Sequence, residues 1–334
     1  DVLENGADSP YLDWFTVYGT PINAYDLSRP PDYEAWWRLH ALPKLNTGNP
    51  VVREYLMGVA ENWIRRGADG WRLDVPEEIV TPGFWEEFRA RVRAVNPEAY
   101  LVGEIWHAAP GWTTTGDRFD GVMNYALTEA ALRFAAAGHI DGQVVAPVNL
   151  TLQPALDAVG YCDAVDRLLA TYPGAAGQGN LNLLGSHDTP RVLSMVGEDR
   201  ASVILAAALI FTFPGAPCIY YGDEVGMTGH HDPGSRAGFP WDRPESWDRR
   251  LLEAFGQLAI LRRRHPALRR GSYRRLAADG FAIAFCREGE GERLIVAVNA
   301  GEAEAVLGLA DGEAGPAASR LWGAGTLATA EGGW

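Results

Sequence analysis

Apolar positions recur along residues 49–265 at two spacings, one helical and one typical of short buried strands. Asn49 and Pro50 favour the start of a helix, apolar side chains follow at helical spacing, and Gly67 ends the segment. Residues 84–95 repeat the helical pattern. Further helices are predicted at 128–137, 154–169, 201–213 and 247–265, and strands at 68–75, 100–105, 119–125, 181–187 and 217–221.

This alternation of helices and strands predicts βα units and a parallel sheet, the α/β class. A closed (β/α)8 barrel of the TIM type has eight strands, and the pattern supplies five. Residues 1–46 mix Pro, Gly and aromatic residues without sustained periodicity. They cannot hold three more units of about 30 residues each. We therefore expect residues 1–270 to form an incomplete barrel domain that begins with a loop-rich segment over residues 1–46.

The pattern changes after residue 270. Residues 281–287 and 293–299 predict two antiparallel strands around a charged, Gly-containing turn. We expect a small, all-β C-terminal domain over residues 271–334.

Charge and cysteine content narrow the classes of function. The net charge of −14 argues against a nucleic-acid partner. Cys162, Cys218 and Cys286 are far apart and suggest neither a metal site nor a disulfide framework, which is compatible with a cytoplasmic protein. No apolar run approaches about 18 residues, so no membrane span is expected. No cofactor is indicated, and no compact calcium-loop pattern is present.

Three predicted strands end in a carboxylate, at Asp74, Glu104 and Asp188. The carboxyl ends of barrel strands meet on one face, where such enzymes assemble their sites. Cleavage of a glycosidic bond requires two carboxyl groups. Each acid alone also has a structural interpretation: a strand-end salt bridge for Asp74, a solvated or capping residue for Glu104, and a helix N-cap for Asp188. Three such coincidences in one sheet are less plausible than a reaction centre.

The residues beside these acids suit the same chemistry. Arg72 lies two positions before Asp74, so both side chains point to one side of the strand, and its charge favours an ionised nucleophile. Glu104 lies near Trp106, an environment that suits a general acid. His187 precedes the third acid, and a His–Asp pair can bind vicinal sugar hydroxyls.

The segments GADGWRLDV, LVGEIW and LLGSHDTPR resemble, in order, the fourth-, fifth- and seventh-strand motifs of the α-amylase family of glycoside hydrolases. The resemblance implies a retaining α-glucan hydrolase in which Asp74 is the nucleophile, Glu104 the acid/base and Asp188 the transition-state stabiliser. It also implies that Arg72 and His187 contact the sugar whose bond is cleaved.

A narrower resemblance comes from residues 42–46, LPKLN, which are similar to the MPKLN segment of neopullulanases, cyclomaltodextrinases and maltogenic amylases. In that group an Asp-Pro-x-x-Arg loop grips the non-reducing side of the substrate, which implies this role for Asp232 and Arg236. Trp106 matches the aromatic residue that lines the leaving-group side. Trp36 and Tyr125 are further aromatic candidates, with core packing as the alternative for Tyr125.

The implied substrates are cyclodextrins, pullulan and maltodextrins, cleaved at α-1,4 bonds, with α-1,6 cleavage and sugar transfer left open. Full-length members of the group dimerise through an N-terminal β domain. That domain, the first three barrel strands and the family's first motif are absent from this sequence, and the C-terminal β domain is short. We therefore expect an N-terminally truncated enzyme. A catalytically impaired fragment, and an exo-acting α-glucosidase or trehalose-forming relative, are the alternatives.

Overall fold

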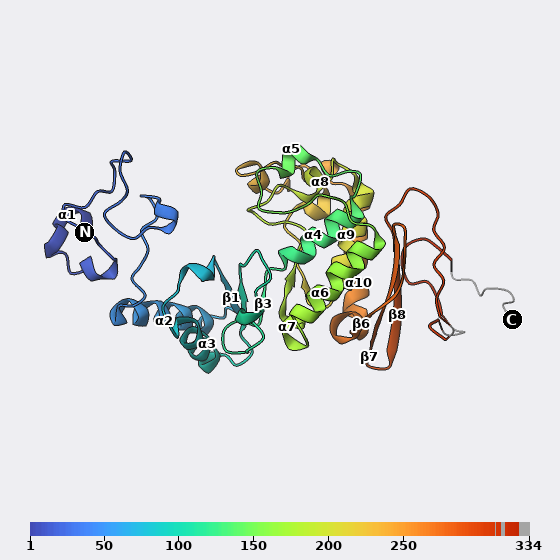
Figure 1. Ribbon diagram of the computed structural model, residues 1–334, viewed down its shortest axis with the longest axis horizontal. Coiled ribbons are helices and arrows are strands. Elements are labelled where there is room, and N and C mark those ends of the chain that lie inside the picture. Colours follow the sequence, from blue (N-terminus) through green and yellow to red (C-terminus); the bar gives the residue numbers. More distant parts are fainter. Residues whose placement is uncertain (311, 315–317, 327–334) are drawn as a thin grey trace. The chain divides into compact units, whose positions relative to one another are not determined.

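The computed structural model describes residues 1–310, 312–314 and 318–326 and divides into two compact units, each described here by itself. The first unit comprises Asp1–Ile105 and Ala109–Val122, and the second comprises Trp106–Ala108 and the described residues from Met123 onward. Figure 1 labels many of the elements of both. Neither unit contains, among its described residues, a helix long and apolar enough to cross a membrane.

The first unit is a parallel sheet with two helices. Its strands, in the order β1-β2-β3, are Gly70–Leu73, Tyr100–Gly103 and Gly121–Val122. Gly70 is required at the start of β1, because a Cβ atom there would lie 2.0 Å from the Tyr100 carbonyl oxygen. The helices are α2 (Pro50–Arg65) and α3 (Phe84–Val95), and a short α1 spans Val2–Asn5.

Helices α2 and α3 follow the predicted bounds closely. The Asn49 side chain accepts a hydrogen bond from the Val51 amide, so it caps α2 as predicted, and Pro50 occupies the first turn. Helix α3 matches the prediction for 84–95. Both helices pack on the sheet through a buried core that includes Met57, Ile64, Trp85, Phe88, Leu101 and Phe119.

Residues 1–46 belong to the first unit and contain little regular structure, as predicted. Short antiparallel bridges join Phe15 to Leu45 and Val17 to Tyr33. Lys44 anchors this segment to the turn after β1, because its Nζ donates to the Glu78 carbonyl oxygen at 2.9 Å and pairs with the Glu78 carboxylate at 3.2 Å.

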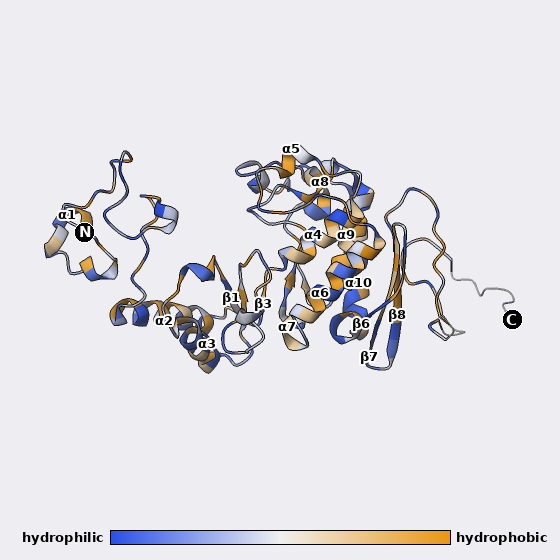
Figure 2. Ribbon diagram, viewed as in Figure 1, coloured by the Kyte–Doolittle hydropathy of each residue, from blue (hydrophilic) through white to orange (hydrophobic). Residues whose placement is uncertain are grey.

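The second unit is mostly helical. Met123 forms a parallel bridge with Leu181, and β4 (Leu181–Asn182) pairs in parallel with β5 (Ala216–Pro217). Helix α9 is apolar over most of its length (Figure 2), and residues 206–211 are all buried. The helices of this unit are α4 (Tyr125–Ala135), α5 (Gly142–Val145), α6 (Ala158–Thr171), α7 (Ala175–Gly179), α8 (Val192–Met195), α9 (Arg200–Thr212), α10 (Arg249–Arg264) and α11 (Pro266–Arg270).

Several predicted bounds in the two units are wrong. The predicted strand 119–125 is only Gly121–Val122, because the Asn124 side chain caps helix α4, which therefore begins at Tyr125. The predicted strand 181–187 is regular only over Leu181–Asn182. Helix α6 begins at Ala158, four residues later than predicted, behind the capping side chain of Asp157.

The C-terminal sheet has one strand more than predicted. Strands β6 (Ser272–Asp279), β7 (Ala282–Gly289) and β8 (Glu292–Asn299) form an antiparallel meander, with β7 in the centre. Strand β6 has no regular alternation and carries a register irregularity between Arg275 and Ala277. The domain boundary after residue 270 stays a prediction.

Two buried arginines bind carbonyl groups at the end of α9: Arg287 from strand β7 and Arg262 from helix α10. Arg287 is fully buried and donates to the carbonyl oxygens of Thr212, Gly271 (2.9 Å) and Ser272 (3.1 Å). Arg262 donates to the carbonyl oxygens of Phe211 at 2.6 Å and Phe213 at 3.0 Å. Burial lowers the pKa of Arg287 to about 10, so it stays protonated near neutral pH. Both cations satisfy carbonyl groups that the helix end leaves open.

We expect Arg287→Met to destabilise the protein by about 3 kcal/mol, because two buried carbonyl oxygens and one part-buried carbonyl oxygen would lose their donor. Denaturant unfolding monitored by circular dichroism measures this change. The control is Arg270→Met, whose exposed side chain pairs with Glu290 at 3.3 Å and should cost less than about 1 kcal/mol. Equal effects of the two substitutions would refute the structural role of Arg287.

Candidate active site

Two of the predicted acids occupy equivalent positions on neighbouring strands. Asp74 directly follows β1 and Glu104 directly follows β2. The register pairs Leu73 with Gly103, and the Glu104 amide donates to the Leu73 carbonyl oxygen at 2.9 Å. Because adjacent strands lie about 4.8 Å apart, this register brings the two acids side by side at the carboxyl end of the sheet.

Arg72 binds both acids at once. Its Nη1 lies 2.6 Å from Asp74 Oδ1, and its Nη2 lies 2.9 Å from Glu104 Oε1. The predicted pairing of Arg72 with Asp74 is present, and the second contact was not anticipated. Nη1 donates a hydrogen bond to Asp74, whereas Nη2 meets Glu104 as an ion pair without hydrogen-bond geometry, so one guanidinium places its charge beside both carboxylates.

The two carboxylates differ in their surroundings. The Asp74 side chain is 78% exposed, whereas that of Glu104 is 4% exposed. Glu104 Oε2 accepts a hydrogen bond from the Val75 amide at 3.1 Å. One acid is therefore open to an incoming molecule, and the other is held from two sides by Arg72 and the backbone.

The backbone around these acids is under tight constraint. Val75 adopts a left-handed conformation with φ 34°, which is unfavourable for a β-branched residue and aims its amide at Glu104. Gly103 allows the Phe119 ring to approach, because a Cβ atom there would lie 2.8 Å from it. The amide of Val75 is a part of the site that sequence reasoning missed, and no side-chain signal could have revealed it.

The third acid, Asp188, contacts a histidine and an arginine within the second unit. Asp188 Oδ2 lies 3.0 Å from His187 Nε2, and its Oδ1 lies 3.1 Å from Arg236 Nη2. Arg236 Nε also lies 3.0 Å from Asp232 Oδ1. The sequence predicted all four residues as site residues, and the structure brings them into one cluster.

Trp106 and Tyr125 form an aromatic stack in the same unit. Their ring centroids are 3.8 Å apart with an interplanar angle of 5°. Tyr125 is 1% exposed and donates from its hydroxyl to Ser186 Oγ at 3.0 Å. The buried Tyr125 ring therefore packs against one face of the Trp106 ring. Direct contact of Tyr125 with a sugar stays a prediction.

Trp36 lies in the loop-rich segment of the first unit. Its ring stacks on Trp37 with centroids 4.1 Å apart, and Trp37 is 70% exposed. The role of Trp36 as a sugar platform stays a prediction. The predicted residues thus fall into groups: Arg72, Asp74 and Glu104 in the first unit, and His187, Asp188, Asp232 and Arg236 with the Trp106–Tyr125 stack in the second.

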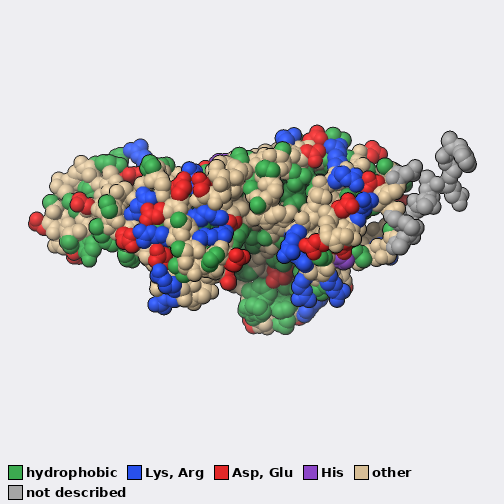
Figure 3. Space-filling view, turned by 90° about the horizontal axis from the view of Figure 1, so that it is seen from below, with side chains coloured by type: hydrophobic (Ala, Val, Ile, Leu, Met, Phe, Trp, Pro, Cys, Tyr) green, Lys and Arg blue, Asp and Glu red, His purple; other side chains and the backbone are tan. Residues whose placement is uncertain are grey.

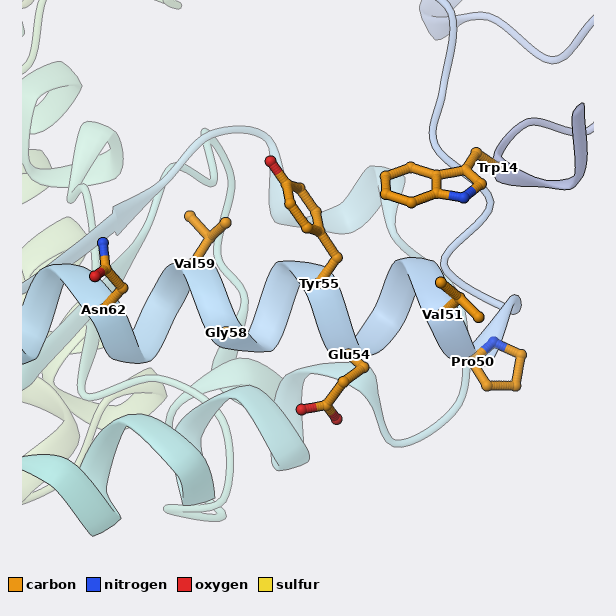
Figure 4. A pocket seen from close by; sticks show the side chains of 8 residues that line it. All are labelled: Trp14, Pro50, Val51, Glu54, Tyr55, Gly58, Val59 and Asn62. Atoms are coloured by element: carbon orange, nitrogen blue, oxygen red, sulfur yellow. The ribbon is translucent and has the colours of Figure 1, made fainter. Parts of the chain in front are cut away.

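Two apolar cavities of the first unit lie elsewhere. One of about 690 Å³ runs along α2 beside Trp14 and Tyr55 (Figure 4). The other, of about 710 Å³, is lined by residues of the loop-rich segment, among them Phe15, Tyr33 and Leu42. Neither is lined by a predicted site residue. The paired carboxylates, rather than cavity size, mark the candidate reaction centre.

The described residues contain no cluster of three or more His, Cys, Asp or Glu side chains suited to a metal ion. The predicted acids are oriented by the ion pairs and hydrogen bonds given above, to Arg72, His187, Arg236 and the Val75 amide. On the face shown in Figure 3, basic side chains are interspersed with acidic ones.

Comparison with known proteins agrees with the motifs. Residues 5–270 match the family model described as "Alpha amylase, catalytic domain". A cyclomaltodextrinase of Geobacillus thermopakistaniensis (strain MAS1) is 42% identical over 302 residues, which is 90% of this chain and 48% of that protein. Neopullulanase 2 of Thermoactinomyces vulgaris is 42% identical over 311 residues, which is 92% of this chain and 49% of that protein.

Solved structures give the same result. The native form of the Nostoc punctiforme debranching enzyme matches with a TM-score of 0.87 and 46% identity, over 91% of this chain and 62% of that one. The chain spans about half the length of the curated relatives it matches. These matches confirm the resemblance inferred from the motifs and the TIM-barrel-type fold class. The number of barrel units in this chain stays a prediction.

Proposed function

Because this chain belongs to the α-amylase family, we propose that it acts as a retaining α-glucan hydrolase on cyclodextrins, pullulan and maltodextrins. The observation that supports this most is the pair of carboxyl groups on adjacent strand ends, joined by one guanidinium. Retaining enzymes place their two carboxyl groups about 5–5.5 Å apart, close to the spacing of adjacent strands.

In the proposed reaction, the exposed Asp74 carboxylate attacks the anomeric carbon while Glu104 donates a proton to the departing glycosidic oxygen. This forms a β-linked glycosyl-enzyme. A linear glucan releases the part beyond the cleaved bond, whereas a cyclodextrin ring opens and stays attached through the new bond. Glu104, now a carboxylate, then removes a proton from water or a sugar hydroxyl, which attacks the same carbon and frees Asp74. The released sugar keeps the α configuration.

Arg72 has two roles in this scheme. It holds Asp74 and Glu104 at a fixed separation, and its charge stabilises Asp74 as the leaving carboxylate of the second step. Asp188, oriented by His187 and Arg236, would stabilise the positive charge that develops on the sugar ring. Trp106 would offer a flat apolar face to a neighbouring glucose unit.

The names of the relatives support the choice of substrate. They include a cyclomaltodextrinase and a neopullulanase, the group that the segment around Lys44 suggested. We propose that residues 1–270 contribute βα units to a (β/α)8 barrel and that residues 271–334 form a β domain. A cytoplasmic location and homodimerisation also remain predictions.

The test is to incubate the purified chain with β-cyclodextrin, pullulan and maltotriose, and to follow reducing ends and product lengths. We expect ring opening, formation of short maltooligosaccharides, and the α anomer as the first product by NMR. A folded chain that turns over none of the three would favour the impaired fragment. Release of glucose from chain ends alone, or formation of trehalose, would favour the exo-acting alternative.

A further inference from the structure

Arg191 is a fully buried cation three residues after Asp188. Its guanidinium carbon lies 4.4 Å from the ring centroid of Tyr220 and 4.5 Å from that of Tyr221. Its Nη1 donates to the Tyr221 carbonyl oxygen and lies 3.5 Å from Asp223 Oδ1. We use the term tyrosine clamp for Arg191 together with Tyr220 and Tyr221.

Hydrogen bonding alone does not account for this burial. Within the described part of the chain, Nε and Nη2 of Arg191 have no hydrogen-bond acceptor. A buried guanidinium with incomplete hydrogen bonding is costly, and an apolar side chain would fill the same space at less cost. The flanking aromatic faces compensate part of the charge and require a planar cation.

The hydroxyl groups of the clamp extend to a loop that carries site residues. Tyr220 donates to the Ser235 carbonyl oxygen at 3.2 Å, and Tyr221 donates to the Ala237 carbonyl oxygen at 2.9 Å. The Arg191 amide donates to the Gly229 carbonyl oxygen at 2.9 Å. The clamp therefore fixes both ends of the segment 229–237.

That segment in turn contacts the loop that follows β4 and carries Asp188. The buried Ser235 donates from Oγ to the His187 carbonyl oxygen at 3.2 Å. Arg236 donates from Nε to the same oxygen at 3.2 Å and from Nη2 to Asp188 at 3.1 Å. A continuous set of contacts thus runs from Arg191 through the two tyrosines and the loop to Asp188.

We propose that Arg191 is a positioning residue: through Tyr220 and Tyr221 it sets the placement of Arg236 against Asp188. This proposal rests on the proposed function for its effect on catalysis. A displacement of the loop by about 1 Å would move Arg236 away from Asp188, and an error of that size can cost about a hundredfold in rate.

The primary test is the variant Tyr220→Phe/Tyr221→Phe, which keeps both rings and removes only the two hydroxyl contacts. We expect kcat on β-cyclodextrin to fall roughly tenfold with little change in KM, while the protein stays folded and the unfolding midpoint falls only by the modest amount that two lost hydrogen bonds cause. In an Arg236→Met background the same pair of changes should have no further effect, because the positioned group is gone. Additive losses in the two backgrounds would overturn the proposal.

Two further variants isolate the clamp. Arg191→Lys keeps the charge but loses the planar group between the rings, and should reproduce the kcat loss. Tyr161→Phe removes the hydroxyl of another buried tyrosine in the same unit and should leave the kinetics unchanged. Wild-type kinetics in both the double tyrosine variant and Arg191→Lys would contradict a positioning role for the clamp.

Hydrogen exchange provides a readout that does not depend on turnover. In the double tyrosine variant, amides of residues 229–237 should exchange roughly tenfold faster, with no change in helix α9. If the unaltered chain turns over no glucan, the proposed function fails, and the exchange rates still decide whether the clamp holds the loop. Unchanged exchange in this segment would overturn the proposal even in an active enzyme.

Discussion

Replacing Asp74 with Asn should lower kcat on β-cyclodextrin by about 10,000-fold, the scale of loss when an enzyme's nucleophile is removed. The amide cannot form the covalent bond to the anomeric carbon, although it preserves the shape of the side chain. Arg72 would still hold Glu104 at 2.9 Å, so folding and substrate binding should change little. Steady-state kinetics and the unfolding midpoint, measured on the same preparation, test both statements.

The control for this prediction lies at the opposite end of the same strand. Asp69 is an exposed aspartate just before β1, whereas Asp74 follows its last residue. Asp69→Asn makes the same chemical change at the amino end of the strand and should leave kcat within about twofold, as is usual for surface substitutions. An Asp74→Asn variant that retains more than about a tenth of wild-type turnover would refute the assignment.

Replacing Glu104 with Gln should lower turnover of β-cyclodextrin by about 100- to 10,000-fold, the range of general acid–base contributions. The loss should depend on the leaving group, because the first step needs a proton only when the departing oxygen is basic. With α-maltosyl fluoride, whose fluoride leaves without protonation, formation of the glycosyl-enzyme should proceed close to the wild-type rate. Rapid-quench detection of fluoride release measures this step.

Glu104→Gln preserves the size and shape of the side chain. The amide oxygen introduced by Glu104→Gln can still accept a hydrogen bond from the Val75 amide, which Glu104 accepts at 3.1 Å. Glu98→Gln, at an exposed position just before β2, is the matched control and should have no effect on either substrate. Equal losses on cyclodextrin and on maltosyl fluoride would show that Glu104 is not the proton donor.

The sequence predicted best those elements whose ends carry local signals. Helices α2 and α3 agree with the prediction because a capping side chain, a proline at the first turn and a closing Asn-Pro pair mark their limits. The acids at strand ends were found because a carboxylate after an apolar run is visible in the chain itself.

The elements that were missed depend on distant contacts. Strand β6 lacks alternation because Arg274 and Arg275 interrupt it, and its pairing with β7 is what makes it a strand. The end of the third predicted strand was placed too late, because Asn124 caps a helix where the apolar run continued. Local strand and helix propensities revealed neither the pairing that makes β6 a strand nor the residue at which the third predicted strand ends.

The same distinction holds for the site. The pairing of Arg72 with Asp74 follows from a spacing of two residues, whereas its contact with Glu104 depends on the register of β1 and β2. The burial of Tyr125 beneath Trp106, and the tyrosine clamp around Arg191, join residues that are distant in the sequence. Physical reading of one sequence identifies the reactive groups but not the contacts that orient them.

Trapping the glycosyl-enzyme is the sharpest test of Asp74 as the nucleophile, because that role requires a covalent bond between the sugar and Asp74. The chain is incubated with a fluorinated maltosyl fluoride that forms the intermediate faster than it is hydrolysed, and is then digested and examined by mass spectrometry. We expect one modified peptide, with the sugar on Asp74, in the wild type and in Asp69→Asn. We expect no modified peptide in Asp74→Asn. A sugar attached to another acid, or turnover of cyclodextrin without any covalent adduct, would contradict this role for Asp74.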